Sequence, residues 1–316
     1  MKNLITGAAG FIGSSIARRL IAQGQTVRGI DCFIDYYPRS IKENNIAPLR
    51  DCAEFEFIED SLMSVDLERL LDGVKVVYHQ AAQAGVRASW GRDFEIYTEN
   101  NIRATQRLLE ACRDRTIKVV YASSSSVYGD TEDLPMRETS PTAPHSPYGV
   151  SKLAAEHLCR LYTRNFGLHT VSLRYFTVYG PGQRPDMAFH KWIRAALTGN
   201  PVTVYGDGAQ TRDFTFIDDI VTANLLAAER GQPGAVYNLG GGNRIDVNGV
   251  LELLGGILGD ALKVERIEKQ KGDVRHTFAD TTLAQQDLGF KPAITLEEGL
   301  CKEAEWIEQV ILPLAV

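Results

Sequence analysis

Short hydrophobic runs alternate with longer segments of helical periodicity from the N-terminus to about residue 175. The runs cover residues 4–5, 27–30, 55–58, 74–78, 119–122 and 170–173. Between them, residues recur three or four positions apart, at Ile102, Thr105, Leu109 and Cys112, and again at Val150, Ala154, His157 and Leu161. Strands that alternate with helices predict βαβ units, and therefore a parallel sheet covered by helices on both faces.

The pattern changes beyond residue 176, where proline- and glycine-rich connectors at 180–182, 184–186 and 206–208 separate shorter elements. We therefore expect an α/β protein with a doubly wound parallel sheet of the Rossmann type and a smaller C-terminal α/β substrate domain. The first domain covers residues 1–176 and a returning segment of about 213–245, and the second covers about 177–212 and 246–316.

Composition narrows the classes of partner. The chain has 316 residues, of which 44% are hydrophobic, and its net charge is −6 with acidic and basic residues interspersed. It carries no basic patch for nucleic acid and no run of about 20 apolar residues for a membrane. Its five cysteines include no C-x-x-C pair, which is typical of reduced thiols. The first residues lead straight into a strand without room for a signal peptide, so we expect a cytoplasmic protein.

Gly7, Gly10 and Gly13 follow the first predicted strand and open the first predicted helix. Glycine lets the backbone turn sharply and approach a pyrophosphate, whose charge the free N–H groups and the helix dipole stabilise. Asp31 ends the second strand about 20 residues later, where a carboxylate can bind an adenosine ribose and repel a 2′-phosphate. These residues favour NAD over NADP, although each also fits a purely structural role as a tight turn or a helix cap.

Tyr148 and Lys152 lie four residues apart on one face of a predicted helix. A tyrosine that acts as a general base needs its pKa lowered from about 10 to about 7, which requires about 4 kcal/mol of differential stabilisation of the phenolate. We expect Lys152 and a positively charged nicotinamide ring to supply it. Taken alone, the pair also fits a solvated helix surface.

The glycine spacing G-x-x-G-x-x-G, a serine-rich strand end and the Tyr-x-x-x-Lys motif follow one another as in the extended branch of the short-chain dehydrogenase/reductase family. This resemblance covers essentially the full chain. It implies a resident NAD, a nucleotide-sugar substrate, and catalytic roles for Ser124, Tyr148 and Lys152. The expected cofactor residues are Gly7, Gly10, Phe11, Ile12, Gly13, Asp31, Asp60, Ser61, Ala81, Asn100, Ser123, Tyr148, Lys152 and Tyr175.

Four consecutive serines, Ser123 to Ser126, end the fifth predicted strand. The resemblance places the catalytic hydroxyl at Ser124 and turns Ser123 toward the cofactor. Nucleotide-sugar dehydratases of this branch carry Asp-Glu where Ser125 and Ser126 stand, and UDP-glucuronate decarboxylases carry a glutamate at the second place. Neither carboxylate is present here, so the two hydroxyls are left to orient a sugar. Selection for small size at a tight strand end is the other interpretation.

The substrate residues follow from the same resemblance. Residues 184–188, RPDMA, resemble a loop of UDP-glucuronic acid 4-epimerases, and Arg184 offers a planar fork for a carboxylate. Residues 202–214 resemble the uridine-diphosphate segment of the branch. The expected substrate contacts are Arg87, Ser124, Ser125, Ser126, Thr177, Arg184, backbone groups at Ala188, Phe189 and Val204, and Tyr205, Arg212 and Arg275. Arg87 fits a plain loop role equally well.

Together these motifs resemble the UDP-glucuronic acid 4-epimerases. The resemblance implies interconversion of UDP-glucuronic and UDP-galacturonic acid through a transient 4-keto intermediate, with NAD retained. The alternatives are a UDP-glucose/UDP-galactose 4-epimerase, then a UDP-glucuronate decarboxylase, and remotely a non-catalytic NAD-binding regulator.

Two further expectations concern assembly and metal. The predicted helices at 93–114 and 148–165 match those that pair in the family's dimers, which implies a homodimer, although their apolar faces also fit packing on the sheet. His79 ends the fourth strand and is expected to be structural. The six histidines form no metal-ligand pattern, so no metal is expected.

Overall fold

A computed structural model describes residues 2–259, 262–268 and 272–314. Seven parallel strands form its main sheet, in the order β10-β6-β5-β4-β1-β2-β3. They are β1 (Lys2–Thr6), β2 (Thr26–Asp31), β3 (Phe55–Glu59), β4 (Val74–His79), β5 (Lys118–Ser124), β6 (His169–Tyr175) and β10 (Val236–Leu239). Every run predicted as a strand therefore belongs to this sheet.

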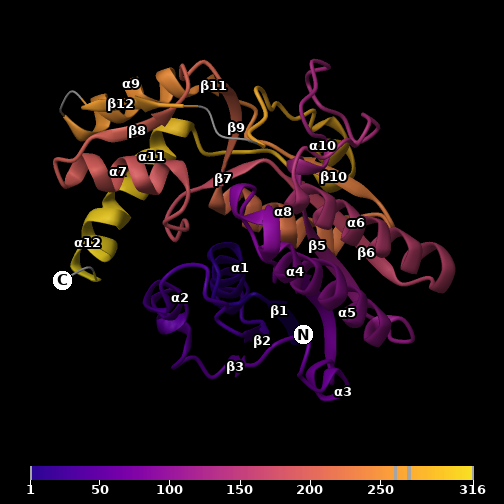
Figure 1. The fold of residues 1–316 in the computed structure, drawn as a ribbon. Coiled ribbons are helices and arrows are strands. Elements are labelled where there is room, and N and C mark those ends of the chain that lie inside the picture. Colours follow the sequence, from indigo (N-terminus) through magenta and orange to yellow (C-terminus); the bar gives the residue numbers. More distant parts are fainter. Residues whose placement is uncertain (1, 260–261, 269–271, 315–316) are drawn as a thin grey trace.

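Helices cover both faces of the main sheet (Figure 1). On one face pack α1 (Phe11–Ala22) and α8 (Ile217–Arg230), and on the other α3 (Leu67–Leu70), α5 (Ala104–Cys112) and α6 (Pro147–Phe166). Successive residues of a strand point to opposite faces, so Leu4 and Ile5 enter different hydrophobic clusters, as do Val119 and Val120. The predicted doubly wound α/β architecture is confirmed.

A smaller group of elements follows β6. Strands β7 (Thr177–Tyr179), β9 (Thr211–Phe216) and β11 (Arg244–Asp246) form one sheet, and β8 (Val202–Tyr205) pairs with β12 (Val264–Ile267). The helices of this group are α7 (Ala188–Leu197), α9 (Val247–Leu258), α11 (Leu296–Trp306) and α12 (Leu312–Leu314) (Figure 1). The chain returns to the main sheet at α8 and β10, against which α10 (Thr282–Leu288) also packs. The exact domain boundaries stay a prediction.

Shorter helical segments complete the chain. Helix α2 (Arg39–Ile46) lies beside α1, and α4 (Phe94–Tyr97) continues through a π-helical segment (Thr98–Arg103) into α5. A second π-helical segment joins α11 to α12 (Ile307–Ile311), and 3-10 turns cover Ala47–Leu49, Arg87–Ser89, Gly91–Asp93 and Ser125–Val127. Several of these segments lie in loops beyond the carboxyl ends of the strands, where α/β sheets bind ligands.

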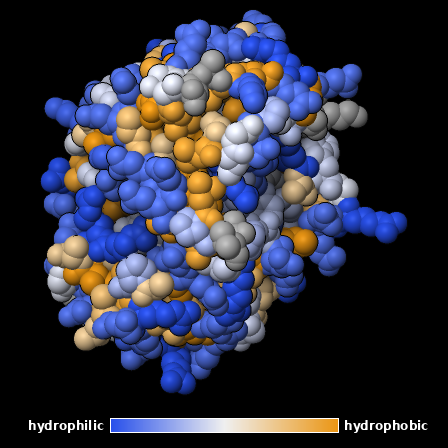
Figure 2. All heavy atoms as spheres, turned by 90° about the vertical axis from the view of Figure 1, so that its left-hand side faces the viewer, coloured by the Kyte–Doolittle hydropathy of each residue, from blue (hydrophilic) through white to orange (hydrophobic). Residues whose placement is uncertain are grey.

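One face of the smaller group carries a band of hydrophobic atoms (Figure 2). Strand β12 and helix α12 lie on this side of the molecule (Figure 1), and Val264, Ile267 and Leu314 are exposed large apolar residues. None of the described helices is both long and apolar enough to cross a membrane.

Candidate active site

A cavity of about 210 Å³ opens between β1 and β4, where the strand order of the main sheet reverses. Ligands of doubly wound sheets bind at such a switch point. Every residue predicted to bind the cofactor lines this cavity, namely Gly7, Gly10, Phe11, Ile12, Gly13, Asp31, Asp60, Ser61, Ala81, Asn100, Ser123, Tyr148, Lys152 and Tyr175. The fold therefore gathers these residues from widely separated parts of the chain.

Glycines shape the turn between β1 and α1. Gly7 has a φ of +68°, and a Cβ there would lie 2.8 Å from the backbone nitrogen of Ala81. A Cβ on Gly13 would lie 2.2 Å from the carbonyl oxygen of Gly7. Gly10 begins α1 without a side-chain cap, so the first N–H groups of the helix can face an anion. This cradle fits the pyrophosphate of a dinucleotide.

Asp31 lies beside the cradle at the end of β2. Its carboxylate accepts N–H bonds from Ala9 at 3.0 Å and from Phe33 at 2.8 Å. Burial raises the pKa of Asp31, and these N–H groups and Lys42 oppose the shift. A carboxylate has about four acceptor positions, so capacity for a ribose remains. Lys42, which no motif indicated, lines the same cavity and donates to the carbonyl of Ile34 at 2.5 Å.

Two other predicted cofactor residues are held by neighbouring polar groups. Asp60 accepts hydrogen bonds from the Ser64 hydroxyl at 2.6 Å and from the N–H of Ser61 at 2.7 Å, and these bonds lower the pKa of Asp60. The Tyr175 hydroxyl donates to Asn224 at 2.9 Å. Both side chains are therefore partly committed to protein partners.

The serine-rich turn and the start of α6 pack closely together. Ser146 caps α6 by accepting the N–H of Gly149 at 3.1 Å, and a Cβ on Gly149 would lie 2.6 Å from the carbonyl oxygen of Ser126. This approach brings the Tyr148 phenol into hydrogen-bonding contact with Ser124. The hydroxyl oxygens of Ser124 and Ser126 lie 3.1 Å apart.

Burial and nearby polar groups set the electrostatics of Tyr148 in opposite directions. Burial raises the pKa of Tyr148 above 10, and Arg184 and the hydrogen bond from Ser124 lower it only in part. In the chain without NAD, desolvation outweighs the nearby charge, and the lower pKa expected with a nicotinamide ring beside the phenol stays a prediction. The cation that acts on the phenol is Arg184.

Lys152 lies one helical turn beyond Tyr148 and is almost fully buried. Its Nζ lies 4.6 Å from the centre of the Tyr121 ring. Burial lowers the pKa of Lys152 to about 7, although Cys159 and Glu156 oppose the shift. Its charge is thus sensitive to pH near neutrality.

Ser123 belongs to a buried charge network. Its hydroxyl donates to Glu156 at 2.7 Å, and Glu156 accepts two hydrogen bonds from Arg174 at 2.6 and 3.0 Å. Both charged side chains are almost inaccessible to solvent. Ser123 lines the cavity, but its hydroxyl points into this network, and its expected contact with a cofactor stays a prediction.

Arg184 reaches the cavity from the loop between β7 and α7. Its guanidinium donates to Asp186 from Nε at 2.9 Å and from a terminal nitrogen at 3.1 Å. The Tyr36 hydroxyl donates to the same carboxylate at 3.1 Å. Burial would raise the pKa of Asp186, but Arg184 and Tyr36 more than offset this, so its pKa is lowered. An acidic group therefore already occupies the fork of Arg184.

The same loop is anchored from α11. The Glu303 carboxylate accepts the N–H of Gly180 at 2.7 Å, and Glu303 has no solvent exposure. Gly180 has a φ of +125°, and a Cβ there would lie 2.8 Å from the side chains of Phe216 and Ile217. Burial raises the pKa of Glu303 well above its ordinary value. The loop start is thus held by a buried carboxyl group.

A second pocket lies in the smaller group of elements, lined by Tyr205, Gly206, Gln210, Arg212, Asp273, Val274 and Arg275. The guanidinium of Arg87 stacks 4.0 Å above the centre of the Tyr205 ring and pairs with Asp273 at 2.7 Å. Arg87 and Tyr205 are therefore brought together, as expected for neighbours of one ligand.

The two arginines expected at the diphosphate already have protein partners. Arg275 forms two 2.9 Å hydrogen bonds to Asp207. Arg212 donates to the carbonyl oxygens of Val274 at 2.8 Å and Thr211 at 2.9 Å. The hydrogen-bond acceptors of Arg212 are neutral carbonyls, and the charges of Asp273 and Asp130 oppose the lowering of its pKa by burial. Arg275 would have to share its fork with Asp207.

The remaining substrate positions differ in what they can offer. Val204 and Phe189 are fully buried, so only their backbones are available. Helix α7 begins at Ala188 without a side-chain cap, which leaves its first N–H groups available. Thr177 and the Ser125 side chain are partly buried. The expected ligand contacts of these residues stay predictions.

Several residues of the cavity wall were not indicated by any motif: Cys32, Ile34, Tyr36, Tyr37, Lys42, Gln80 and Gln83. They follow β2 and β4, as expected at the carboxyl edge of a parallel sheet. His79 is structural, as expected, because its buried ring contacts Thr6 at 2.7 Å and Thr105 at 2.9 Å, and burial lowers its pKa to about 3.

A glycine cradle at the switch point of a doubly wound sheet, with serine, tyrosine and lysine at the other end of one cavity, defines a dinucleotide-binding protein of the short-chain dehydrogenase class. The comparisons with known proteins agree with the extended branch. The chain belongs to the NAD dependent epimerase/dehydratase family, whose model matches residues 3–240.

Relatives match nearly the whole chain. An uncharacterised UDP-glucose epimerase of Bacillus subtilis strain 168, YtcB, is 45% identical over 98% of this chain and 99% of its own length. A UDP-glucuronate 4-epimerase of Thermodesulfobacterium geofontis is 36% identical, with coverages of 98% and 96%. The crystal structure of UDP-glucuronic acid 4-epimerase from Bacillus cereus, in complex with UDP-glucuronic acid and NAD, matches with a TM-score of 0.95 at 43% identity, covering 98% of this chain and 100% of that chain.

Proposed function

We propose that this protein is an NAD-dependent 4-epimerase that interconverts UDP-glucuronic acid and UDP-galacturonic acid. The observation that carries the proposal is that Tyr148 and Arg184 line one cavity with the glycine cradle, and that Ser124 and Arg184 both act on the pKa of the Tyr148 phenol. Relatives that bear the name UDP-glucuronate 4-epimerase support the acidic sugar.

Tyr148 is the proposed base that takes the proton of the sugar C4 hydroxyl and later returns one. Ser124 holds the reacting oxygen, and both Ser124 and Arg184 favour the phenolate against the effect of burial. NAD, held by the cradle and Asp31, would accept the C4 hydrogen as hydride and give it back. The chain's task at this centre is placement and electrostatics.

Inversion requires the oxidised sugar to present its other face while the nucleotide stays bound. We assign the nucleotide to the pocket at Tyr205, where Arg212 and Arg275 can meet a diphosphate. This pocket lies on different elements from Tyr148, so the sugar can turn about its link to the diphosphate.

Hydroxyls replace the acids that other reactions of the branch use. Ser125 and Ser126 form a 3-10 turn directly after β5, and neither position offers a carboxylate. The carboxylates that would serve as acid or base for the expulsion of water, or that would assist decarboxylation, are therefore absent from these two positions. The side chains can only orient the sugar, which favours simple epimerisation.

The 4-keto form of the acidic sugar is a β-keto acid, which loses CO2 when its carboxylate bond aligns with the carbonyl π system. We propose that Arg184, with Thr177 and a serine, holds the carboxylate out of that alignment. Because Asp186 occupies the Arg184 fork, the incoming carboxylate must share or take over those donors.

Arg184→Ala tests this role. Purified enzyme is incubated with UDP-glucuronate, and the products are separated by ion-exchange chromatography. The expected result is a raised KM and a new UDP-pentose product, with Arg137→Ala, an exposed arginine outside the cavity, unaffected. Epimerisation at an unchanged KM without pentose would contradict the proposal.

One observation favours a second candidate, UDP-glucose 4-epimerase, because the 45% identical relative is named an uncharacterised UDP-glucose epimerase. The chemistry at Tyr148 is the same for a neutral sugar. Incubation with UDP-glucose and UDP-glucuronate in parallel decides between them: turnover of UDP-glucose alone would replace the acidic-sugar proposal.

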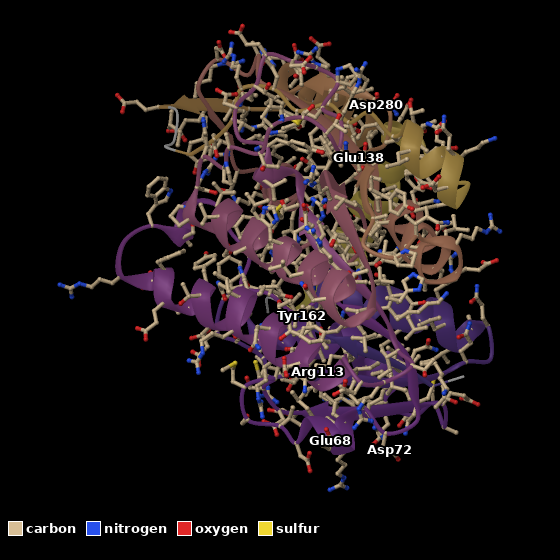
Figure 3. The ribbon with its side chains drawn as sticks, turned by 90° about the vertical axis from the view of Figure 1, so that its right-hand side faces the viewer. Glu68, Asp72, Arg113, Glu138, Tyr162 and Asp280 are labelled. Atoms are coloured by element: carbon tan, nitrogen blue, oxygen red, sulfur yellow. The ribbon has the colours of Figure 1, made fainter. Side chains whose placement is uncertain are left out.

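We also propose a homodimer that forms through α6. Val150, Leu161 and Phe166 are exposed by 47%, 51% and 53%, whereas the apolar stripe of α5 packs on the sheet. Figure 3 shows Tyr162 of α6 close to Arg113, which follows α5. Leu161→Glu should convert a dimer to a monomer in sedimentation, while Leu314→Glu, at an exposed site elsewhere, should not; a wild-type monomer would refute the dimer.

The cytoplasmic location is likewise proposed. All five cysteines are free thiols in the structure, including the exposed Cys32. Free thiols persist in reducing compartments. Cell fractionation followed by immunodetection tests this location.

A further inference from the structure

Side chains join two loops that both border the cofactor cavity. Tyr36 lies between β2 and α2, and its hydroxyl donates to Asp186, which lies between β7 and α7, at 3.1 Å. Arg184 donates to the same carboxylate at 2.9 and 3.1 Å. We call these three side chains the Tyr36–Asp186 bridge.

The bridge links the two ends of the cavity. Tyr36 is on the loop that begins at Asp31, and Arg184 acts on the pKa of Tyr148. Both Tyr36 and Arg184 line the cavity. The loop that carries Arg184 also reaches down toward α1 and α2 (Figure 1), where a Cβ on Gly182 would lie 3.2 Å from an aromatic ring of α1. The cofactor side and the sugar side are thus tied together across the cavity.

The surrounding structure sets the position of the Tyr36 hydroxyl. Gly85 has a φ of +104°, and a Cβ there would lie 2.2 Å from the hydroxyl oxygen. Phe33, on the same loop, is buried at a positive φ of +50°. A non-glycine residue keeps such a conformation only where its surroundings over-determine it. The loop is therefore built to hold Tyr36 against Asp186.

An ion pair beside the nucleotide pocket is more exposed than the bridge. The side chains of Arg275 and Asp207 are 40% and 59% exposed, whereas those of Arg184 and Asp186 are 24% and 31% exposed. Exposed ion pairs hold a structure together weakly, and burial strengthens them. The end that would take the UDP group can therefore open more readily than the bridge.

We infer that the Tyr36–Asp186 bridge is a latch that retains NAD while UDP-sugars exchange at the other pocket. The inference rests on the proposed function in one respect, since an epimerase regenerates its cofactor in every cycle and never needs to release it. Release in mid-cycle would strand the sugar in its keto form. Tyr36 and Asp186 are positioning residues in this scheme, because they act through the closed loops.

The test measures NAD release. Wild-type, Tyr36→Phe and Asp186→Asn proteins are loaded with NAD, freed of excess by gel filtration and mixed with an NAD-degrading enzyme as a trap. The NAD that stays bound is followed by chromatography of denatured samples. Tyr36→Phe should release NAD about tenfold faster, the factor expected for loss of one hydrogen bond to a charged group. Tyr237→Phe is the matched control, because the Tyr237 hydroxyl donates to the Asp287 carboxylate at 3.0 Å and Tyr237 does not line the cavity.

Two further measurements separate a latch from general damage. The double variant should release NAD no faster than the faster single variant, because both changes open one bridge. The affinity of the NAD-saturated protein for UDP, measured by calorimetry, should not change in Tyr36→Phe. Equal release rates for wild type and Tyr36→Phe, or equal acceleration in Tyr237→Phe, would overturn the inference.

The outcome is independent of the sugar. If the protein binds NAD but epimerises neither UDP-sugar, the proposed function fails, and the release rates still decide on the latch. If epimerisation is observed and the release rates are equal, only the latch fails. A Tyr36→Phe protein that melts far below wild type is replaced by Asp186→Asn, which keeps the side-chain shape.

Discussion

Replacing Lys152 by methionine should stabilise the NAD-free fold while it abolishes turnover. Lys152 is 3% exposed, and burial lowers its pKa from 10.5 to about 7. That difference corresponds to about 5 kcal/mol of unfavourable free energy for the charged form in the folded state. Methionine fills a similar volume without the charge.

The sign of the pH dependence follows from proton binding. Below pH 7 the folded state carries the full penalty, because Lys152 is charged in both the folded and unfolded states. Between pH 7 and 10.5 the unfolded chain binds a proton that the folded chain has lost, so the stability of the wild type rises by about 1.4 kcal/mol per pH unit from this group. The advantage of methionine should therefore be largest at pH 6 and shrink toward pH 9.

The net effect is smaller than the penalty. The cation–π contact between Lys152 and Tyr121 is lost, which removes about 1–2 kcal/mol of stabilisation. We expect Lys152→Met to raise the free energy of unfolding by about 3 kcal/mol at pH 6. Such a gain at a catalytic position is the usual trade between stability and activity.

Urea unfolding of NAD-free wild-type, Lys152→Met and Lys291→Met proteins at pH 6, 7.5 and 9 provides the measurement. Lys291 is an exposed loop lysine, and its replacement should leave stability nearly unchanged at each pH. A Lys152→Met protein no more stable than wild type at pH 6, or equally favoured at pH 6 and pH 9, would refute the reasoning.

Three other predictions concern buried charge and the cofactor. Burial raises the pKa of Glu303, so its contribution to stability is fully present below its unfolded pKa and is lost as the pH rises toward its folded pKa. In thermal melts, Glu303→Gln should therefore lose less stability than wild type between pH 5 and 9. Arg174→Met leaves Glu156 buried without its partner and should cost about 3–5 kcal/mol in urea unfolding, whereas Arg39→Met, at an exposed pair, should change little. Asp31→Asn should reduce the ratio of the affinities for NAD and NADP at least several-fold, as measured by calorimetric titration. An unchanged affinity ratio would exclude a contact between Asp31 and the ribose.

Hydrophobic periodicity predicted six of the seven strands of the main sheet, because buried parallel strands are continuous apolar runs, and it did not predict β10. Motif order then predicted which residues line the cavity. Gly7 follows β1, Asp31 ends β2, and Tyr148 lies at the start of α6, the helix after β5, and the carboxyl ends of these strands share one edge. Periodicity did not show which of two apolar helix faces packs on the sheet. The stripe that includes Leu109 packs on the sheet, whereas Val150 and Leu161 face outward, because an apolar face does not itself specify what covers it.

Other features depend on contacts between distant segments. The rise in the pKa of Tyr148 in the NAD-free chain had no sequence signal, because desolvation depends on everything packed around the phenol. The Tyr36–Asp186 contact joins residues 150 positions apart, and no sequence motif contains both of them. The pairing of Arg275 with Asp207 likewise has no local signal. Motifs identify residue types, whereas only the folded chain shows which partners compete for them.

The contact between Glu303 and Gly180 has a consequence for synthesis and truncation. Its two residues are 123 positions apart, and Glu303 lies in α11, one of the last elements to be translated. A nascent or shortened chain that stops before α11 still contains every strand of the main sheet and the complete glycine cradle. Such a fragment contains the residues of the dinucleotide site, while its sugar loop lacks the Glu303 anchor. We therefore expect the chain to bind NAD before it can convert a sugar.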